Sequence, residues 1–381
     1  MPSTAVSQPG TAFHRDRHAG RFRVAVVGAT GYAGGDLVRI LVRHPNVEIV
    51  GLTGRGRDAE PIGGIHPHLG GTGLTIDDDV ERATAEADAV FLALPHGAAA
   101  AQVPAIAARG VAVIDLGPDF RLRNPADYPR WYGFEHPAPK LLGSAIYGLP
   151  ELHRAELAGL RTAETAIVGA PGCYPTATLL ALAPLARAGL IADVVVDAKS
   201  GVSGAGREAK PEMLFSEVNE SVRAYGVGGH RHTAEIEQEL ALAFAPEARV
   251  TADARMAKDS PAFLPVDFLP HLIPMTRGIL ASCHVRPTRP VDQAELDALY
   301  ADAYDGESFV RVVAAPPATK HVTGSNNALV HVHHDGRTGR ILAFGVIDNL
   351  VKGAAGQAVQ AFNIVHGLPE TAGLEALPLA P

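Results

Sequence analysis

Short apolar runs alternate with segments of helical periodicity over the first third of the chain. The run over residues 23–27 is apolar and β-branched, as in a strand buried on both faces. Three spaced glycines follow it, and then residues 36–43 carry Leu37, Ile40 and Leu41 at helical spacing. Further strand-like runs occupy residues 47–54, 88–95 and 111–117, and an alanine-rich helical stretch, residues 97–109, lies between the last two. Strands that alternate with helices predict an α/β fold with a doubly wound, Rossmann-type parallel sheet.

The pattern changes after residue 150. The next stretch reads as a strand, a helix, a second strand and a loop rich in glycine and serine. From about residue 250 the apolar and polar positions alternate as in antiparallel strands, and GRTGR forms a hairpin turn. The last helix carries an apolar stripe. We expect a second, α+β domain with a mixed or antiparallel sheet, and a division into a tail (1–20), a first domain (21–172), the second domain (173–348) and a C-terminal helical segment (349–381).

Composition narrows the functional classes. The 381 residues are enough for two domains, and the net charge of −8 gives no electrostatic basis for binding nucleic acid or an anionic membrane. With only two cysteines, a disulfide framework is excluded, and we expect a cytoplasmic protein. The first twenty residues are polar and predict a disordered tail rather than a signal peptide. No apolar run approaches the ~18 residues that span a bilayer.

The first stretch with candidate chemistry is a glycine-rich turn between the first strand and its helix. Its residues are Gly28, Ala29, Thr30, Gly31, Tyr32, Ala33 and Gly34. Such a turn exposes backbone N–H groups and a helix N-terminus to the pyrophosphate of a dinucleotide. The spacing is GxxGxxG rather than the commoner GxGxxG, and an ordinary βα turn is the alternative interpretation. The strand before it and the helix after it favour nucleotide binding.

The end of the second strand indicates which dinucleotide is bound. An NAD site usually has an acidic residue there to hold the ribose hydroxyls. This strand ends at Thr53 and continues with Arg55 and Arg57, and Glu48 lies too early to serve. Two arginines suit a 2′-phosphate, so we predict NADP, the alternative being two solvated loop arginines.

A cysteine at the start of a predicted helix is the candidate nucleophile. Cys173 lies in GAPGCYPTAT, between Gly172 and a proline of the type that opens helices. The positive end of the helix dipole lowers the pKa of a thiol, and a glycine leaves room for a substrate carbonyl. The alternative is a small buried apolar residue, which we expect for Cys283 in its alternating strand.

Two histidines are candidate partners of that thiol. His230 and His232 precede an amphipathic helix that starts near Thr233. A cysteine enzyme needs a histidine that is distant in sequence and adjacent in the fold. No cysteine or carboxylate set converges on the pair, so we expect no metal. Further along the same domain, the loop KSGVSGAGREA, with Ser200, Ser203, Gly204 and Arg207, could hold a phosphate or the nicotinamide end of a cofactor.

These stretches together resemble the N-acetyl-γ-glutamyl-phosphate reductase family, within the aspartate-semialdehyde dehydrogenase superfamily. The resemblance extends from about residue 22 to near the C-terminus and rests on motifs in the family's order: VGATGYAGGDLVRIL, FLALPHG, DLGPDFRL, YGLPEL, PGCYPTA, SGVSGAGR, HRHTAEIEQ and IDNLVKGAAGQAVQ. One departure is Ala234, where the family usually has proline. The N-terminal tail is an addition.

The resemblance implies a reaction of arginine biosynthesis. N-acetyl-γ-glutamyl phosphate and NADPH would give N-acetylglutamate semialdehyde, NADP and phosphate through a thioester on Cys173. His230 or His232 would be the acid/base, and the spacing from Arg223 to His230 matches a substrate-binding arginine and histidine in related semialdehyde dehydrogenases.

The resemblance also implies further contacts. Arg121 and Arg207 are candidates for a phosphate or a substrate carboxylate, since guanidinium binds both. Pro95 and His96 would close over the cofactor, and Asn349 would contact the nicotinamide. The C-terminal helix would return to the NADP-binding domain. A homodimer or homotetramer is implied.

Three alternatives stay open at this point. A sister reductase would act on aspartyl phosphate or on a carrier-linked aminoadipyl phosphate. A phosphorylating aldehyde dehydrogenase of the glyceraldehyde-phosphate type would use NAD and lack HRHTAEIEQ. A non-catalytic NADP-binding regulator would leave Cys173 inert.

Overall fold

A parallel sheet forms the centre of the first half of the chain. The computed structural model describes residues 20–244 and 264–379, so the predicted tail, apart from residue 20, lies outside the described residues. The sheet has six strands in the order β2-β1-β5-β6-β8-β7, and all its pairings are parallel. Its strands are β1 (Phe22–Val27), β2 (Val47–Thr53), β5 (Ala89–Leu92), β6 (Ala112–Asp115), β7 (Ala145–Tyr147) and β8 (Ile167–Gly169).

Helices cover this sheet and explain its apolar strands. Every residue of β5 and β6 is buried, as expected for parallel strands with helices on both faces. The helices of this part are α1 (Tyr32–Leu41), α2 (Ile62–Ile65), α3 (Val80–Thr84), α4 (Ala98–Ala107), α5 (Asp127–Tyr132) and α6 (Pro150–Gly159). A small two-stranded sheet of β3 (Glu60–Pro61) and β4 (Thr75–Ile76) lies beside α2. The predicted doubly wound parallel sheet is confirmed.

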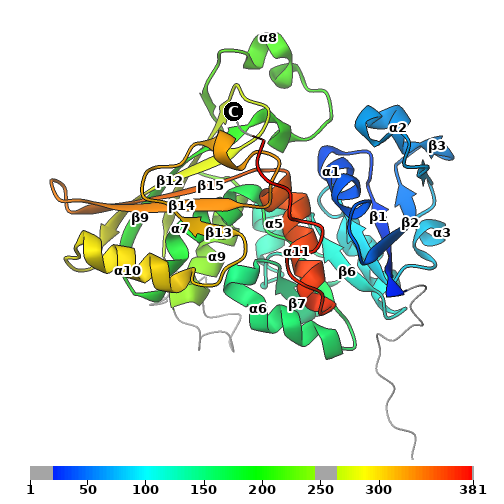
Figure 1. Ribbon diagram of the computed structural model, residues 1–381, viewed down its shortest axis with the longest axis horizontal. Helices are drawn as coiled ribbons and strands as arrows, with labels where there is room; N and C mark the ends of the chain where they lie inside the picture. The colour runs from blue at the N-terminus through cyan, green and yellow to red at the C-terminus, as the bar shows by residue number, and fades with distance from the viewer. Residues whose placement is uncertain (1–19, 245–263, 380–381) are drawn as a thin grey trace, which may run out of the picture.

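A mixed sheet forms the second part, with strand order β10-β11-β9-β12-β15-β14-β13. Its strands are β9 (Ile191–Gly201), β10 (Arg223–Ala224), β11 (Val266–Ile273), β12 (Ile279–Pro287), β13 (Val310–Val312), β14 (Ala328–Asp335) and β15 (Arg340–Ile347). The accompanying helices are α7 (Cys173–Arg187), α8 (Phe215–Val218), α9 (His232–Phe244) and α10 (Gln293–Ala303). Helices α7, α9 and α10 lie along one face of the sheet (Figure 1). The predicted α+β domain with a mixed sheet is confirmed.

The pairing within this sheet differs in part from the expected antiparallel pattern. β14 and β15 form the predicted antiparallel hairpin. β11 and β12, however, do not pair with each other, because β9 lies between them, parallel to β11 and antiparallel to β12. Alternation in the sequence tells which residues share a face of a strand, but it does not tell which strands are neighbours.

The helix of the C-terminal segment is buried on all sides. A π-helical turn (Val351–Ala355) leads into α11 (Gly356–Val365), and every residue of α11 is buried. The apolar positions of the predicted stripe are buried, and the polar residues Gln357, Gln360 and Asn363 on the rest of α11 are buried as well. Phe362 packs on the first sheet, with ring centroids 5.8 Å from Phe22 and 5.5 Å from Phe91. Figure 1 shows α11 between α6 and α1.

None of the helices in the described parts of the chain is long and apolar enough to cross a membrane.

Candidate functional site

The glycine turn has the tight geometry of a strand-to-helix connection. Gly28 has φ +93°, and a Cβ there would lie 2.4 Å from the carbonyl oxygen of Ala93. A Cβ on Gly34 would lie 2.2 Å from the carbonyl oxygen of Gly28, so the helix can approach the strand only with glycine. Thr53 ends β2 and holds the turn, because its carbonyl accepts N–H bonds from Gly28 and Ala29 at 3.1 and 2.8 Å.

Gly31 leaves the first turn of α1 open. It occupies the N-cap position, and within the described residues no side chain caps this helix. A Cβ on Gly31 would have only the Gly28 carbonyl oxygen nearby, at 3.8 Å. Tyr32 is exposed and Ala33 is partly exposed. An uncapped helix N-terminus beside a glycine turn is a fitting site for a phosphate.

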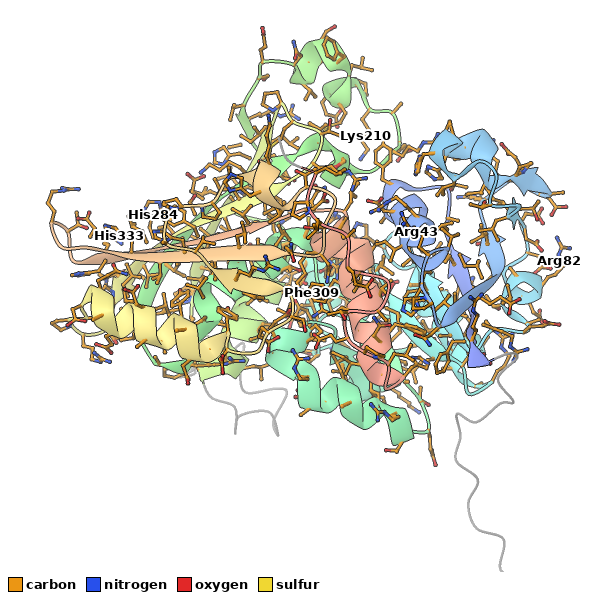
Figure 2. The ribbon with its side chains drawn as sticks, in the orientation of Figure 1. Arg43, Arg82, Lys210, His284, Phe309 and His333 are labelled. Carbon is orange, nitrogen blue, oxygen red and sulfur yellow. The ribbon has the colours of Figure 1, made fainter. Side chains whose placement is uncertain are left out.

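A cavity of about 330 Å³ joins this turn to the second domain. Tyr32 lines it together with Ser203, Arg207 and Leu350, which come from segments far apart in the sequence. Lys210, labelled in Figure 2, also lines it and was not predicted. Polar groups from both domains, among them Tyr32, Arg207 and Lys210, therefore face one space.

Further contacts tie the Gly/Ser loop to the first domain. Arg207 donates to the carbonyls of Thr30 at 3.1 Å and Ile65 at 3.2 Å. Asn349 donates to Ser203 Oγ at 2.9 Å, and its Oδ1 accepts from the N–H of Gly278 at 2.8 Å. Both ends of the Asn349 side chain are thus fixed.

Asn349 also lies near Gly204, where a Cβ would be 3.8 Å from its Nδ2.

The loop after β5 contains Pro95 and His96. The His96 ring nitrogen contacts the Arg231 guanidinium of the HRH motif. Burial, followed by the charge of Arg231, lowers the pKa of His96 to about 4.

The two arginines beyond β2 differ in their surroundings. Arg57 forms a salt bridge with Glu60 at 2.8 Å, whereas Arg55 is exposed. The neighbouring Arg82 forms salt bridges with Asp77 and Asp58. A fixed 2′-phosphate site is therefore not preformed at this strand end, and the role of Arg55 and Arg57 stays a prediction.

Cys173 begins α7, with Gly172 as the N-cap residue, so the helix starts two residues before the proline expected to open it. The side chain is partly buried. Burial raises the pKa of the Cys173 thiol to about 11, although Arg121 and the N–H of Tyr174 act in the opposite direction. The expected lowering of the thiol pKa is therefore wrong, because the cost of burying the thiolate exceeds the benefit of the helix N-terminus.

Gly172 is held between two side chains of α9. Its N–H donates to Glu235 Oε1 at 2.7 Å, and a Cβ on Gly172 would lie 2.6 Å from His232 Nε2. The ring of His232 therefore packs on the backbone next to the cysteine. Glu235 also accepts from Tyr147 Oη at 2.7 Å.

The two histidines of the motif lie together and differ in burial. Their ring centroids are 4.8 Å apart, and the backbone N–H of His232 donates to Nδ1 of His230 at 3.2 Å. Burial and then the charge of Arg231 lower the pKa of His230 to about 4. His232 is buried, and its Nδ1 has no hydrogen-bond partner among the described residues. Burial and then His230 hold the pKa of His232 well below its usual value, so both rings are neutral at pH 7.

The predicted substrate arginines lie in different environments. Arg121 is buried and donates to the carbonyls of Ala170 at 2.7 Å and Leu116 at 2.8 Å, with Glu235 at 3.4 Å. Arg223 is exposed on β10. The structure thus brings Arg121, Cys173 and His232 around Gly172 and Glu235, while Arg223 lies at the edge of the second sheet.

Sequence reasoning missed two members of this group. Glu235 follows His232 by three residues, so the two share a face of α9, and that spacing was a signal in HRHTAE. Gly353 lies against the cysteine, since a Cβ there would be 2.7 Å from Cys173 Cβ. Nothing in the sequence around Gly353 indicates that contact, because it depends on the packing of the C-terminal segment.

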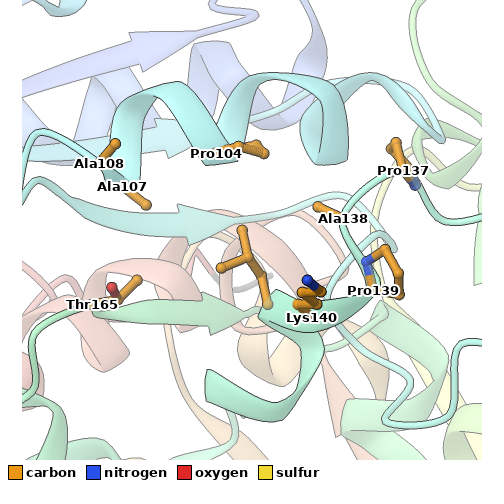
Figure 3. A pocket seen from close by; sticks show the side chains of 9 residues that line it. Pro104, Ala107, Ala108, Pro137, Ala138, Pro139, Lys140 and Thr165 are labelled. Carbon is orange, nitrogen blue, oxygen red and sulfur yellow. The ribbon is translucent and has the colours of Figure 1, made fainter.

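A second cavity, of about 490 Å³, lies away from these residues (Figure 3). Pro104 of α4, Pro137, Pro139 and Lys140 line it, with alanines and Thr165. It contains no cysteine, histidine or carboxylate and is no alternative to the group around Cys173.

Family models match both halves of the chain. The model described as "Semialdehyde dehydrogenase, NAD binding domain" matches residues 23–160, and "Semialdehyde dehydrogenase, dimerisation domain" matches residues 173–349. Among solved structures, aspartate semialdehyde dehydrogenase II of Vibrio cholerae is similar with a TM-score of 0.65 and 20% identity, covering 91% of this chain and 98% of that one. The aspartate semialdehyde dehydrogenase of Candida albicans has a TM-score of 0.64 and 14% identity, covering 93% and 99%. These structures support the fold.

Curated relatives are closer in sequence. N-acetyl-gamma-glutamyl-phosphate reductase of Heliobacterium modesticaldum is 46% identical over 371 residues, covering 94% of this chain and 99% of the relative. The proteins of the same name from Desulforudis audaxviator and Halorhodospira halophila are each 47% identical, covering 92% and 94% of this chain and 97% and 99% of their own lengths. The chain therefore belongs to the N-acetyl-γ-glutamyl-phosphate reductase family of semialdehyde dehydrogenases.

Proposed function

We propose that the protein reduces N-acetyl-γ-glutamyl phosphate to N-acetylglutamate 5-semialdehyde, with release of phosphate, as a step of arginine biosynthesis. The observation that carries the proposal is Cys173 at the start of α7, with His232 packed on the residue before it. The cavity that joins the glycine turn to Ser203 supports a dinucleotide beside that thiol. The curated relatives, which match nearly the whole chain, carry the name of this activity.

The first half of the reaction forms a thioester. Sγ of Cys173 attacks the acyl carbon, the carbon–oxygen bond to phosphate breaks, and phosphate leaves with the electron pair. A histidine takes the thiol proton. This covalent step divides a difficult reduction into two easier ones.

The second half releases the aldehyde. When bound, the reduced nicotinamide supplies the hydride for the thioester carbonyl. The same histidine protonates the resulting alkoxide, and removal of that proton as the carbon–sulfur bond breaks gives the aldehyde and the Cys173 thiolate. Throughout both steps, the hydrogen bond from Asn349 to Ser203 holds the Gly/Ser loop against the start of the C-terminal segment.

We assign the acid/base role to His230. Its ring is neutral at pH 7, so it can take up the thiol proton and return a proton to the alkoxide. His230 is also half-buried, whereas His232 is buried against Gly172. His232 then has a positioning role: its ring packs on Gly172 and limits the directions from which substrate can reach Cys173.

The arginines receive separate roles in the proposal. Arg223, exposed seven residues before His230, would bind the substrate carboxylate, and Arg207 would bind the phosphate after leaving the carbonyls of Thr30 and Ile65. Arg121, which counteracts the raised pKa of the Cys173 thiol, would stabilise the thiolate.

We propose NADP as the cofactor. Arg55 is exposed at the end of β2, and Arg57 has only an exposed salt bridge with Glu60, so both can turn to a 2′-phosphate at small cost. The double variant Arg55→Ala/Arg57→Ala should weaken NADP binding more than NAD binding. Equal losses for the two cofactors would contradict this assignment.

The reverse reaction tests the whole proposal. Supplied with N-acetylglutamate semialdehyde, NADP and phosphate, the protein should form reduced cofactor, and Cys173→Ser should abolish this. Cys283→Ser is the matched control, because Cys283 is buried in β12. A higher rate with aspartate semialdehyde, or with a carrier-linked aminoadipate semialdehyde, would replace the substrate assignment. Binding of cofactor without turnover of any of these aldehydes would favour a regulator.

We further propose a cytoplasmic homodimer or homotetramer. The family model that matches residues 173–349 is described as a dimerisation domain. In that part of the chain Leu214, Phe215, Val222 and Val227 are exposed, from 56% to 79%. Sedimentation of the wild type and of Phe215→Ser would show whether these side chains lie in a subunit interface.

A further inference from the structure

Lys352 is a fully buried cation in the turn that contacts the candidate nucleophile. Its side chain has no exposed surface, and it belongs to the π-helical turn that precedes α11. Charged side chains are almost never buried without a partner, so its contacts must offset a large desolvation cost. No step of the proposed reaction uses this ammonium group.

Its partners all come from the core behind the turn. Nζ donates to Glu151 Oε1 at 2.6 Å and to Gln360 Oε1 at 2.7 Å, and lies 5.8 Å from the ring centroid of Phe309. Burial disfavours the Glu151 carboxylate, but the charge of Lys352 outweighs it and the pKa of Glu151 is lowered. Lys352 and Glu151 therefore form a buried ion pair between the π-turn and α6.

Other charges extend this network away from Cys173. Gln360 also donates to Glu151 at 3.2 Å and to Glu370 at 2.7 Å. Arg154 bridges Glu370 and Glu307. The network thus anchors one side of the π-turn to α6 and to the chain beyond α11.

The other side of the same turn faces the reaction site. Gly353, the residue after Lys352, lies against Cys173, where an added Cβ would be 2.7 Å from Cys173 Cβ. The N–H of Gly353 donates to the carbonyl of Asp348 at 2.9 Å, and the Asp348 carboxylate accepts from the N–H of Leu350 at 2.8 Å. Asn349, between them, reaches Ser203 and Gly278. Hydrogen bonds therefore hold the turn from Asp348 to Gly353.

We propose that Lys352 is a positioning residue that presses the backbone of Gly353 against Cys173 and so fixes the position of the thiol. The proposal rests on the proposed role of Cys173 as nucleophile. A π-helical turn contains one residue more than a turn of α-helix, and such turns are often found at functional sites. Here the ammonium group of Lys352 is held in the core, and the backbone of the next residue, Gly353, lies against the cysteine.

A purely structural ion pair would have a different consequence. Loss of such a pair lowers stability but leaves turnover by the folded fraction unchanged. Loss of a positioning contact leaves substrate binding intact and lowers kcat, since small misplacements of a reacting group are costly. It also frees Cys173 from a contact that buries it, so a small reagent should reach the thiol faster.

The decisive variant is Lys352→Met/Glu151→Gln, which removes both charges and leaves no uncompensated ion. We expect kcat to fall about tenfold or more with KM within about twofold, because misplacement affects the reacting geometry. Alkylation of Cys173 by iodoacetamide, measured by mass spectrometry at fixed pH, should become several-fold faster. Lys140→Met, at an exposed position, is the control and should change neither value.

Gly353→Ala approaches the same contact from the other side. Its methyl group would press on Cys173, so we expect slower turnover together with slower alkylation. Unchanged kcat and alkylation in either folded variant would overturn the proposal, and if the charge-free variant does not fold, Gly353→Ala alone decides. The alkylation measurement needs no reductase activity, so an inactive wild type would refute the proposed function and still leave the positioning role testable.

Discussion

The sulfur of Cys173 lies where two influences on a thiol oppose each other. A helix N-terminus stabilises a thiolate, whereas burial disfavours it. In the free site burial prevails, and the pKa of the thiol is about 11. The neutral His230, with a pKa of about 4, cannot take that proton at equilibrium. Formation of the thiolate therefore depends on what the bound substrate and cofactor change around Cys173.

This difference predicts a pH dependence for the free enzyme. Below a pKa of about 11 the thiolate fraction rises about tenfold for each pH unit, so the rate of iodoacetamide alkylation of Cys173 should climb steeply between pH 7 and 10. Mass spectrometry of the Cys283→Ser variant would report on this thiol alone. A rate that levels off below pH 8 would contradict the raised pKa.

The two histidines can be separated by asparagine substitution. His230→Asn should lower kcat by ~10²–10⁴-fold, the usual contribution of a general acid or base. His232→Asn keeps a polar side chain beside Gly172. We expect it to change kcat about tenfold or less, since it removes a packing contact and no group that transfers a proton. Steady-state kinetics of both variants tests the assignment, and the opposite order of losses would move the acid/base role to His232.

At the scale of single elements, the glycines that begin α1 have different tasks. Gly34 is needed for packing, because a methyl group there would overlap the Gly28 carbonyl, whereas Gly31 has open space in front of it. Gly34→Ala should lower the free energy of unfolding by about 1–3 kcal/mol, a typical cost of overpacking. Gly31→Ala should leave unfolding nearly unchanged and weaken cofactor binding about tenfold, since it covers a helix N-terminus. Denaturant unfolding and cofactor titration of both variants would check this, and a destabilised Gly31→Ala protein would speak against it.

Elements also show where sequence reasoning succeeds and where it stops. The glycine turn and the HRH motif are local patterns, and strand, turn and helix follow from neighbouring residues, so they could be predicted. The insertion of β9 between β11 and β12 could not, because periodicity does not specify strand neighbours. The π-turn at Lys352 and its contact with Cys173 likewise depend on tertiary packing of distant segments. The raised thiol pKa was missed for the same reason, since burial is a property of the folded whole.

At the scale of the whole molecule, a small set of charges joins the two domains. Arg277, in the turn between β11 and β12, reaches Asp36 of α1 at 2.5 Å and lies 3.6 Å from Asp348. Asp36 is 4% exposed. Arg207 makes the parallel connection to Thr30 and Ile65. In the free protein these bonds fix the glycine turn relative to the Gly/Ser loop, and so define the cavity between them.

The Asp36–Arg277 pair should therefore stabilise the joined state in a pH-dependent way. Burial raises the pKa of Asp36, but the hydrogen bond with Arg277 and the charge of Arg39 outweigh it, so the pKa is lowered overall. A lowered carboxyl pKa gives stability that is present above its unfolded value of about 4 and is lost as the pH falls through the folded value. In a double-mutant cycle with Asp36→Asn and Arg277→Met at pH 7, the coupling free energy should be about 1–3 kcal/mol, and it should shrink once the pH falls low enough to protonate Asp36 in the folded protein. The exposed pair of Arg289 and Glu295 is the matched control, and its coupling should be much weaker because solvent screens the two charges. Equal coupling in the two pairs, or coupling of Asp36 with Arg277 that persists unchanged in acid, would show that packing around α1, rather than this charge pair, holds the glycine turn against the second domain.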